Sequence, residues 1–373
     1  MITERELLCT LALTKIPGIG VIGARNLLSG VGTATGVFEN RSELAGRIPG
    51  IGKRLADALD CPDAFARAEK ELLFAEKSGI QVITWNDENY PARLCECDDA
   101  PIVLFFKGNA DLNTLRIINM VGTRKATEYG ERLCRRFLED LRELCPGVLV
   151  VSGLAYGIDI YSHRAALANG LMTVGVLAHG LDRIYPSVHR NTAAAMISQG
   201  GLLTEFMSET NPDRPNFVRR NRIVAGMSDA TLVVQSAGKG GALITADIAQ
   251  SYHRDCFAFP GRIDDEYSQG CNCLIRDNKA ALIQTAEDFV KAMCWDTEKQ
   301  SLTPLPVQRE LFVDLSDEER KVAEILRQEG NQHINALTVA ANIPVHKMNA
   351  ILFELEMKGI VRILAGGMYQ LLG

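Results

Sequence analysis

The spacing of apolar residues divides the chain into parts of different character. Up to about residue 78, apolar positions recur at helical spacing, whereas from Ile80 onward short runs rich in β-branched and aromatic residues alternate with helical segments. Residues 295–314 are irregular and contain two prolines. We therefore predict a helical domain at 1–78, an α/β core at 79–294, a linker at 295–314 and a further domain at 315–373.

The pattern after the linker predicts a winged helix. Ser316 opens a capping box, S-D-E-E, and is followed by a helix, then a helix-turn-helix at 334–358 and a hairpin at 360–372. Its third helix sets His346, Lys347, Asn349 and Lys358 against Glu354 and Glu356. Because this basic face is thin, contact with protein or weak contact with duplex DNA is favoured over sequence-specific reading.

A repeated pentapeptide marks the N-terminal part. IPGIG occurs at Ile16–Gly20 and at Ile48–Gly52, each time between apolar helical stretches. This pattern resembles a doubled helix-hairpin-helix module, in which Gly18, Gly20, Gly50 and Gly52 open helices whose N–H groups suit DNA phosphates. Few basic residues surround the turns, so a purely structural role in packing helices stays open.

Glycine-rich loops follow consecutive strand-like runs in the core. They are GTRKAT (122–127), SGLAYGID (152–159), AHGLDRIYP (178–186) and SAGKGGALITA (236–246). Strand–loop–helix repetition predicts an extended Rossmann-like, doubly wound and mostly parallel sheet, with ligands bound beyond the carboxyl ends of the strands. No loop is a Walker A motif or a clean G-x-G-x-x-G, so the loops indicate a phosphate or nucleotide ligand without identifying it.

A basic run lies between the third and fourth loops. Arg214, Arg219, Arg220 and Arg222 fall within nine residues that contain no acid, with Phe217 and Asn221 among them. Arginine forks pair with phosphate oxygens and an exposed aromatic ring stacks on an unpaired base, so the run predicts a groove for single-stranded nucleic acid. The alternative is a solvated turn with Phe217 in the core.

Charge and cysteine content limit the class of protein. The net charge of −6 excludes a generic polycation, but a local arginine cluster keeps its effect because screening acts over about 8 Å. Ten cysteines include the C-x-C pairs Cys95/Cys97 and Cys271/Cys273, and neither pair has zinc-site spacing. Without a secretory signal or a long apolar run, we expect a cytoplasmic protein with reduced thiols, no membrane contact, and no metal or cofactor.

Together and in this order, the core motifs resemble the DNA-processing protein A family (DprA, also called Smf) over residues 80–285. The matching segments are YPARL, P-x-V-L-F-F-K-G, GTR, SGLAYGID, HGLDRIYP, TEF, FVRRNRIVAG, GALITA and FPGRIDDEYSQGCNCLI. The resemblance implies a non-catalytic recombination mediator that binds single-stranded DNA, protects incoming DNA, loads the recombinase RecA during natural transformation and forms a homodimer. Weaker binding of double-stranded DNA is also compatible with it.

Motif matching also implies which residues contact nucleic acid. They are Gly122, Thr123, Arg124, Ser152, Gly153, Arg214, Phe217, Arg219, Asn221, Arg222, Lys239 and Gly240. Two departures from the family pattern stand out: serine is common where Thr123 stands, and often stands at Gly240 and Gly241. The second departure puts a hydroxyl contact in that loop in doubt.

Two other classes of protein remain as alternatives. A related Rossmann-like group processes nucleotide sugars or phosphoribosyl compounds, and here Glu205 with Asp182 would be the acid/base candidates. The signature PGGxGTxxE of phosphoribohydrolases is missing and two apparent DNA-binding modules flank the core, which favours the mediator. A sequence-specific regulator would rest on the winged helix alone.

Overall fold

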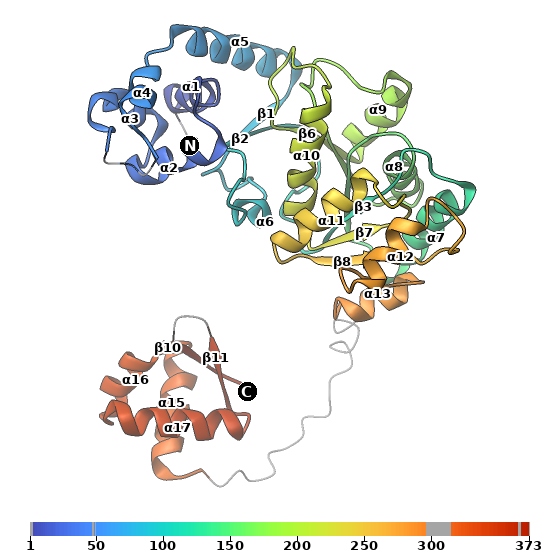
Figure 1. Cartoon of the computed structure of the whole chain (residues 1–373). Helices are drawn as coiled ribbons and strands as arrows, with labels where there is room; N and C mark the ends of the chain where they lie inside the picture. The colour runs from blue at the N-terminus through green and yellow to red at the C-terminus, as the bar shows by residue number, and fades with distance from the viewer. Residues whose placement is uncertain (1–2, 47, 49, 296–314, 365–366, 373) are drawn as a thin grey trace. The chain divides into compact units, whose positions relative to one another are not determined.

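A computed structural model describes residues 3–46, 48, 50–295, 315–364 and 367–372 (Figure 1). The chain divides into two compact units, Met1–Thr297 and Glu298–Gly373. Apart from Trp295, the predicted linker lies outside the described residues. Each unit is considered by itself.

The N-terminal part of the first unit is helical, as its apolar spacing predicts. Its elements are α1 (Glu4–Leu13), α2 (Val21–Val31), α3 (Ala34–Glu39), η1 (Arg41–Glu43), α4 (Lys53–Ala58) and α5 (Pro62–Ser78). Leu11, Leu13 and Leu27 are fully buried in a cluster that also contains Val103 and Phe105 of the adjoining sheet. These helices therefore share a hydrophobic core with the edge of the sheet, beside which they lie in Figure 1.

Nine strands form one sheet in the order β1-β2-β6-β5-β4-β3-β7-β8-β9. Strands β1 and β2 pair antiparallel with each other, as do β2 and β6, and all other neighbours are parallel. The strands are β1 (Gln81–Thr84), β2 (Val103–Gly108), β3 (Ile117–Val121), β4 (Leu149–Ser152), β5 (Thr173–Val176), β6 (Gly200–Thr204), β7 (Ala230–Val233), β8 (Asp255–Ala258) and β9 (Ala281–Leu282).

Helices cover both faces of this sheet. They are α6 (Ala92–Cys95), α7 (Glu128–Leu144), α8 (Ile158–Ala168), η2 (Ser187–His189), α9 (Arg190–Ser198), α10 (Arg214–Gly226), α11 (Gly241–Ser251), α12 (Gln269–Arg276) and α13 (Ala286–Ala292). Successive residues of β3 enter different cores: Ile117 packs with α10, α11 and α12, whereas Ile118 packs with α7, α8 and α13. This arrangement confirms the predicted α/β fold with a mostly parallel, doubly wound sheet.

The strand order creates a switch point between β3 and β7. From β3 the chain builds outward through β4 and β5 to β6, and then returns to the other side of β3 to add β7, β8 and β9. The connections that follow β3 and β7 therefore run to opposite sides of the sheet. A crevice opens between them, beyond the carboxyl ends of β3 and β7. The fold therefore fixes where a ligand site is expected.

The second unit has the predicted winged-helix pattern. It contains α15 (Asp317–Glu329), β10 (Gln332–His333), α16 (Ile334–Ala341), α17 (Val345–Met357), β11 (Val361–Leu364) and β12 (Met368–Leu371), with strand order β10-β12-β11. The Ser316 capping box is present, with Glu319 as its second member. Glu318 and Glu319 form ion pairs with Lys347 and Lys358, which reduces the already thin basic face.

Across the described ranges, no helix combines the length and the apolar character needed to cross a membrane.

Candidate nucleic-acid interface

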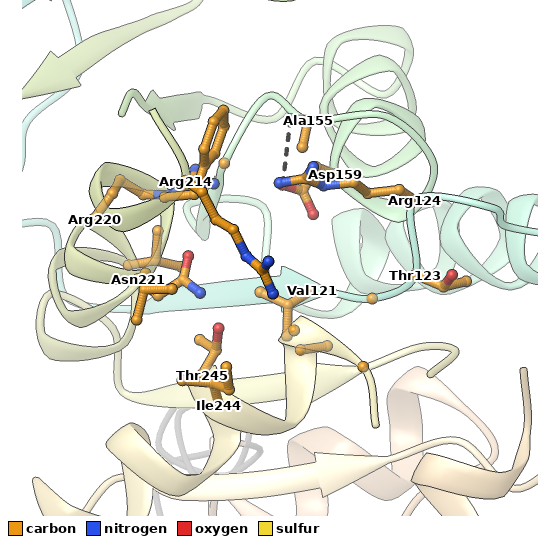
Figure 2. A pocket seen from close by; sticks show the side chains of 18 of the residues that line it. Val121, Thr123, Arg124, Ala155, Asp159, Arg214, Arg220, Asn221, Ile244 and Thr245 are labelled. Atoms are coloured by element: carbon orange, nitrogen blue, oxygen red, sulfur yellow. Dashed lines mark hydrogen bonds between the residues drawn. The ribbon is translucent and has the colours of Figure 1, made fainter. Parts of the chain in front are cut away.

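A cavity of about 590 Å³ lies at the switch point of the sheet (Figure 2). Three of the predicted glycine-rich loops contribute to its wall: residues 122–124 after β3, Gly153 and Ala155 after β4, and the loop that leads from β7 into α11. Helix α10 supplies the opposite wall. The loop at 178–186 does not line the cavity.

Helical periodicity divides the basic run between two surfaces. The cavity is lined by Arg214, Phe217, Val218, Arg220, Asn221 and Val224, which recur every three or four residues along α10. Arg219 and Arg222, three residues apart, do not line it. The continuous patch predicted from the sequence is therefore two separate groups of arginines.

Cations without acidic partners surround the cavity. Arg124, Arg214 and Lys239 are exposed and line the cavity, and none of them forms an ion pair with a carboxylate of the described chain. The Arg124 guanidinium lies 4.9 Å above the Phe217 ring. Because Arg214 and Lys239 pair with no described carboxylate and Arg124 faces only the buried Asp159, the opening attracts anions, while the Phe217 ring offers an apolar surface beside these cations.

The cavity wall contains a buried arginine and a buried carboxyl group. Arg220 is 4% exposed and its Nη1 donates to the Val176 carbonyl at 2.6 Å, while Asp159 accepts from the Ala155 N–H at 3.3 Å. Burial raises the pKa of Asp159 and lowers that of Arg220, and each group opposes the shift of the other. A buried guanidinium and a buried carboxyl group therefore lie in the cavity wall together with the exposed cations.

Gly153 makes room for that arginine. A Cβ atom at this position would lie 1.8 Å from Arg220 Nη1 and 2.3 Å from its Cζ, which no side chain tolerates without displacement. Gly153 therefore lines the cavity, as predicted for a site residue, and also permits the close approach of Arg220.

Most of the predicted contact residues meet in the cavity, and three do not. Those that line it are Gly122, Thr123, Arg124, Gly153, Arg214, Phe217, Asn221, Lys239 and Gly240. Ser152 is buried and its hydroxyl donates to the Met120 carbonyl at 2.6 Å, so it holds two neighbouring strands together. Arg219 and Arg222 lie on the other surface of α10. Conversely, Arg220 and Asp159 line the cavity but are absent from the predicted contact residues. Arg220 follows Phe217 by three residues, and this helical spacing could have placed it on the same face of α10.

Arg222 lies outside the cavity, so its predicted contact with nucleic acid stays a prediction. It is 7% exposed, and its Nη2 lies 2.6 Å from Glu205 Oε2, the same oxygen that Arg219 contacts at 2.6 Å. Glu205 itself is 2% exposed in its side chain. Because Glu205 lies 17 residues away in sequence, this buried ion pair was not predictable from the arginine spacing.

The acid/base candidates of the alternative enzyme are also engaged elsewhere. Glu205 holds the two arginines, and Asp182 pairs with Arg183 at 2.8 Å and accepts the Glu209 N–H at 3.0 Å. Neither carboxylate lines the cavity. The structure therefore does not assemble this pair at the expected ligand site.

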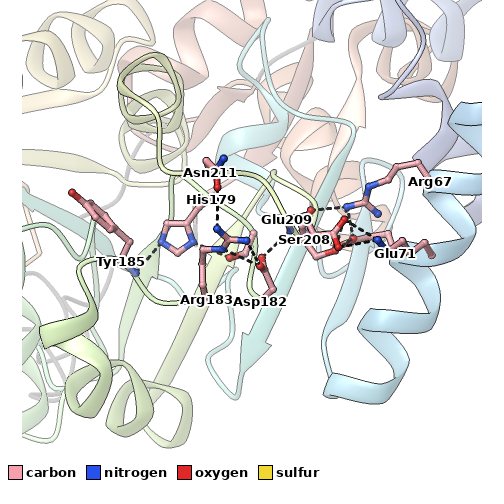
Figure 3. A network of polar contacts seen from close by, with 11 residues as sticks. Arg67, Glu71, His179, Asp182, Arg183, Tyr185, Ser208, Glu209 and Asn211 are labelled. Atoms are coloured by element: carbon pink, nitrogen blue, oxygen red, sulfur yellow. Dashed lines mark hydrogen bonds and ion pairs between the residues drawn. The ribbon is translucent and has the colours of Figure 1, made fainter.

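Polar contacts from α5 fix the segment that precedes α10 (Figure 3). Buried Glu71 accepts hydrogen bonds from the Ser208 N–H at 2.9 Å and the Ser208 hydroxyl at 2.5 Å, and from Arg67 Nη2 at 2.9 Å. Farther along the same segment, Arg183 Nη1 donates to Asn211 Oδ1 at 2.9 Å. The helical part thus positions the chain that leads into the α10 wall.

The glycine turns of the N-terminal hairpins have the expected backbone geometry. Gly18 and Gly50 have φ of 82° and 81°. Gly20 and Gly52 are the N-cap residues of α2 and α4. None of these four glycines lines the cavity. Contact between these turns and a DNA phosphate therefore stays a prediction.

Comparison with known proteins gives two family matches. Residues 81–294 match the model of DNA recombination-mediator protein A, and residues 310–367 match that of the DprA winged helix domain. Protein Smf of Escherichia coli is 34% identical over 308 residues, which cover 81% of this chain and 80% of that protein. DNA processing protein DprA of Bacillus subtilis is 37% identical over 61% of this chain and 76% of its own length.

Solved structures agree with these matches. The X-ray structure of DNA processing protein A from Streptococcus pneumoniae superposes with a TM-score of 0.60 at 30% identity, covering 78% of this chain and 98% of that chain. The Helicobacter pylori structure, which is described as showing a single-stranded DNA binding mode, has a TM-score of 0.52 at 27% identity and covers 58% of this chain and 96% of that one.

Proposed function

Because the chain belongs to the DNA recombination-mediator protein A family, we propose that it binds single-stranded DNA in the switch-point cavity. In this proposal Arg124, Arg214 and Lys239 neutralise phosphates, and Phe217 stacks on a base. Arg220 and Asp159 support the wall behind them.

One observation carries the proposal: unpaired cations and an aromatic ring meet in one cavity at the carboxyl ends of the strands. Phosphate contacts supply affinity without reading sequence, whereas stacking needs an accessible base face. In a duplex the base faces are covered by their neighbours, so an aromatic ring on a cavity wall favours single strands. The Helicobacter pylori relative, named for its single-stranded DNA binding, supports the same ligand class.

The wider role is proposed from family membership. A protein of this family would protect incoming DNA and load RecA onto it during natural transformation, acting as a homodimer in the cytoplasm. The winged helix and the glycine hairpins would add weak contacts with duplex DNA or protein. We propose no catalytic step, since Glu205 and Asp182 are held by arginines outside the cavity.

A competition titration tests this function. A labelled single-stranded oligonucleotide is bound to the full chain and displaced with unlabelled single-stranded or duplex competitor of the same sequence, and the supernatant is assayed for released nucleotide. We expect single strands to compete much better and no nucleotide to be released. Preferential displacement by duplex, or turnover of the nucleotide, would refute the proposal.

Matched variants tie the binding to the cavity. Arg214→Ala removes an unpaired cation that lines the cavity, whereas Arg135→Ala removes an exposed arginine of α7 that does not line it. We expect only Arg214→Ala to weaken binding, by about tenfold, as for one charge-assisted hydrogen bond. Equal effects of the two variants would show that binding follows net charge rather than the cavity.

A further inference from the structure

Two tyrosines close to the cavity leave much of their surface in water. Tyr185, on the loop after β5, and Tyr156, on the loop after β4, are each 47% exposed. Neither lines the cavity, although Gly153 and Ala155 on the Tyr156 loop do. Exposed aromatic rings beside a cavity are surfaces on which a ligand can stack.

Tyr185 extends the aromatic surface of the cavity outward. Its ring centroid lies 6.1 Å from that of Phe217, with an angle of 59° between the ring planes. On the cavity wall, Phe217 is also covered by the Arg124 guanidinium at 4.9 Å. Arg124, Phe217 and Tyr185 therefore form a continuous series from the cavity to the protein surface.

Buried histidines hold both tyrosines in place. The Tyr185 N–H donates to Nε2 of His179 at 3.3 Å, and Nδ1 of the same ring donates to the Gly180 carbonyl at 2.8 Å. Burial lowers the pKa of His179, and because Nδ1 donates to a carbonyl, Nε2 is the ring atom that accepts the Tyr185 N–H. Figure 3 shows the Tyr185 ring directed away from this polar network.

Tyr156 is supported in a similar way. Its ring packs edge-on against His189 at a centroid distance of 5.1 Å, and Nδ1 of His189 lies 2.9 Å from the Leu154 carbonyl. His189 is 3% exposed, so a fixed buried ring supports a half-exposed one. Rings that are already positioned lose little conformational freedom when a ligand stacks on them.

We propose that Phe217, Tyr185 and Tyr156 form an aromatic shelf that stacks bases of a single strand where it lies outside the cavity. The proposal rests on the proposed function, and adds a surface that lengthens the binding site beyond the cavity. Stacking suits any base, so the shelf contributes affinity without sequence preference.

Two features of the shelf indicate that its ligand is a single strand: it adjoins the cavity, and a cation lies near it. Phe217 lies on the cavity wall and its ring adjoins that of Tyr185, so a strand bound in the cavity reaches this part of the shelf without a break. Arg190, next in the chain to His189, is exposed and pairs with no carboxylate of the described residues, which suits a phosphate beside a stacked base. A protein partner would not depend on strand length, and the test uses that difference.

The test compares short and long oligonucleotides on the full chain. Oligothymidylates of about four and about sixteen nucleotides are titrated against wild type, Tyr185→Ala, Tyr156→Ala and Tyr185→Phe. We expect each alanine variant to lower the ratio of long-strand to short-strand affinity by about five- to tenfold, near the low end of stacking contributions. Tyr185→Phe should restore the ratio because it keeps the ring.

Two controls distinguish stacking on the shelf from a general loss of affinity. Tyr129→Ala removes an exposed tyrosine of α7 that does not line the cavity, and should leave the ratio at the wild-type value. Quenching of a 2-aminopurine base outside the cavity should be lost in Tyr185→Ala. An unchanged ratio, or an equal loss at both lengths, would overturn the shelf, whereas failure of wild type to bind any single strand would overturn the proposed function itself.

Discussion

Replacing Arg222 by alanine should lower the stability of the fold without removing a group from the proposed DNA site. Arg222 is 7% exposed and shares the Oε2 atom of Glu205 with Arg219, at 2.6 Å for both pairs. Its Nη1 also donates to the Asp99 carbonyl. The substitution removes the buried member of this arrangement, while Arg219, with 49% of its side chain exposed, remains.

The size of the effect follows from burial. Breaking a buried ion pair costs about 3–5 kcal/mol because one charge is left uncompensated. Glu205 keeps a half-exposed partner here, so we expect a loss near the low end, about 3 kcal/mol. Unfolding roughly 300 residues at about 2.1 cal/mol/K per residue has an entropy of about 0.6 kcal/mol/K, so this loss lowers Tm by about 5 °C.

The assay pairs Arg222→Ala with Arg124→Ala. Arg124 is exposed and lines the cavity, so its removal should leave Tm within about 1 °C and weaken single-strand binding about tenfold. Tm is measured by calorimetry, and affinity by fluorescence anisotropy at fixed salt, well below Tm. If Arg222→Ala kept its Tm but lost tenfold in affinity, the division of α10 into a cavity face and a structural face would be wrong.

Three further predictions concern packing, pH and salt. Gly153→Ala should lower the free energy of unfolding in urea by about 1–3 kcal/mol and weaken DNA binding, because its Cβ would overlap Arg220. Gly147→Ala, which has open space around it, should do neither. Equal stabilities of the two variants would contradict this prediction. Burial lowers the pKa of His163 from 6.5 to about 3, so the unfolded chain binds the extra proton and stability falls as pH falls through that window. His163→Gln should flatten the slope of stability against pH by up to about 1.4 kcal/mol per pH unit, and an unchanged slope would show that His163 does not cause it. The logarithm of affinity should fall linearly with that of salt concentration, with a slope reduced by about 1 in Lys239→Ala; a flat plot would exclude phosphate contacts.

The fold was largely predictable because its local signals agree. Strand-like runs ending in glycine loops predicted a parallel sheet with helices on both faces, and the S-D-E-E capping box at Ser316 is present in the structure. The strand order was not predictable, since pairing of β3 with β7 joins segments more than a hundred residues apart. The shared core of the N-terminal helices and Phe105 also depends on contacts distant in sequence.

The site was predictable in composition but not in arrangement. The glycine loops and Phe217 indicated the cavity, yet arginines that are neighbours in the sequence of α10 point to different sides because the helix turns between them. The partner of Arg222 is a carboxylate on another segment, which no local pattern indicates. Exposure of Tyr185 beside Phe217 likewise depends on the packing of two separate segments.

Cross-link mapping tests the central claim most directly. A single-stranded oligonucleotide containing 5-iodouracil is irradiated on the full chain, and the modified peptides are identified. Binding in the switch-point cavity predicts cross-links to Phe217, with Tyr185 modified when the strand extends outward, and loss of these products with unlabelled competitor. Cross-links confined to the glycine hairpins or to residues 315–364 would place the strand elsewhere and contradict the account.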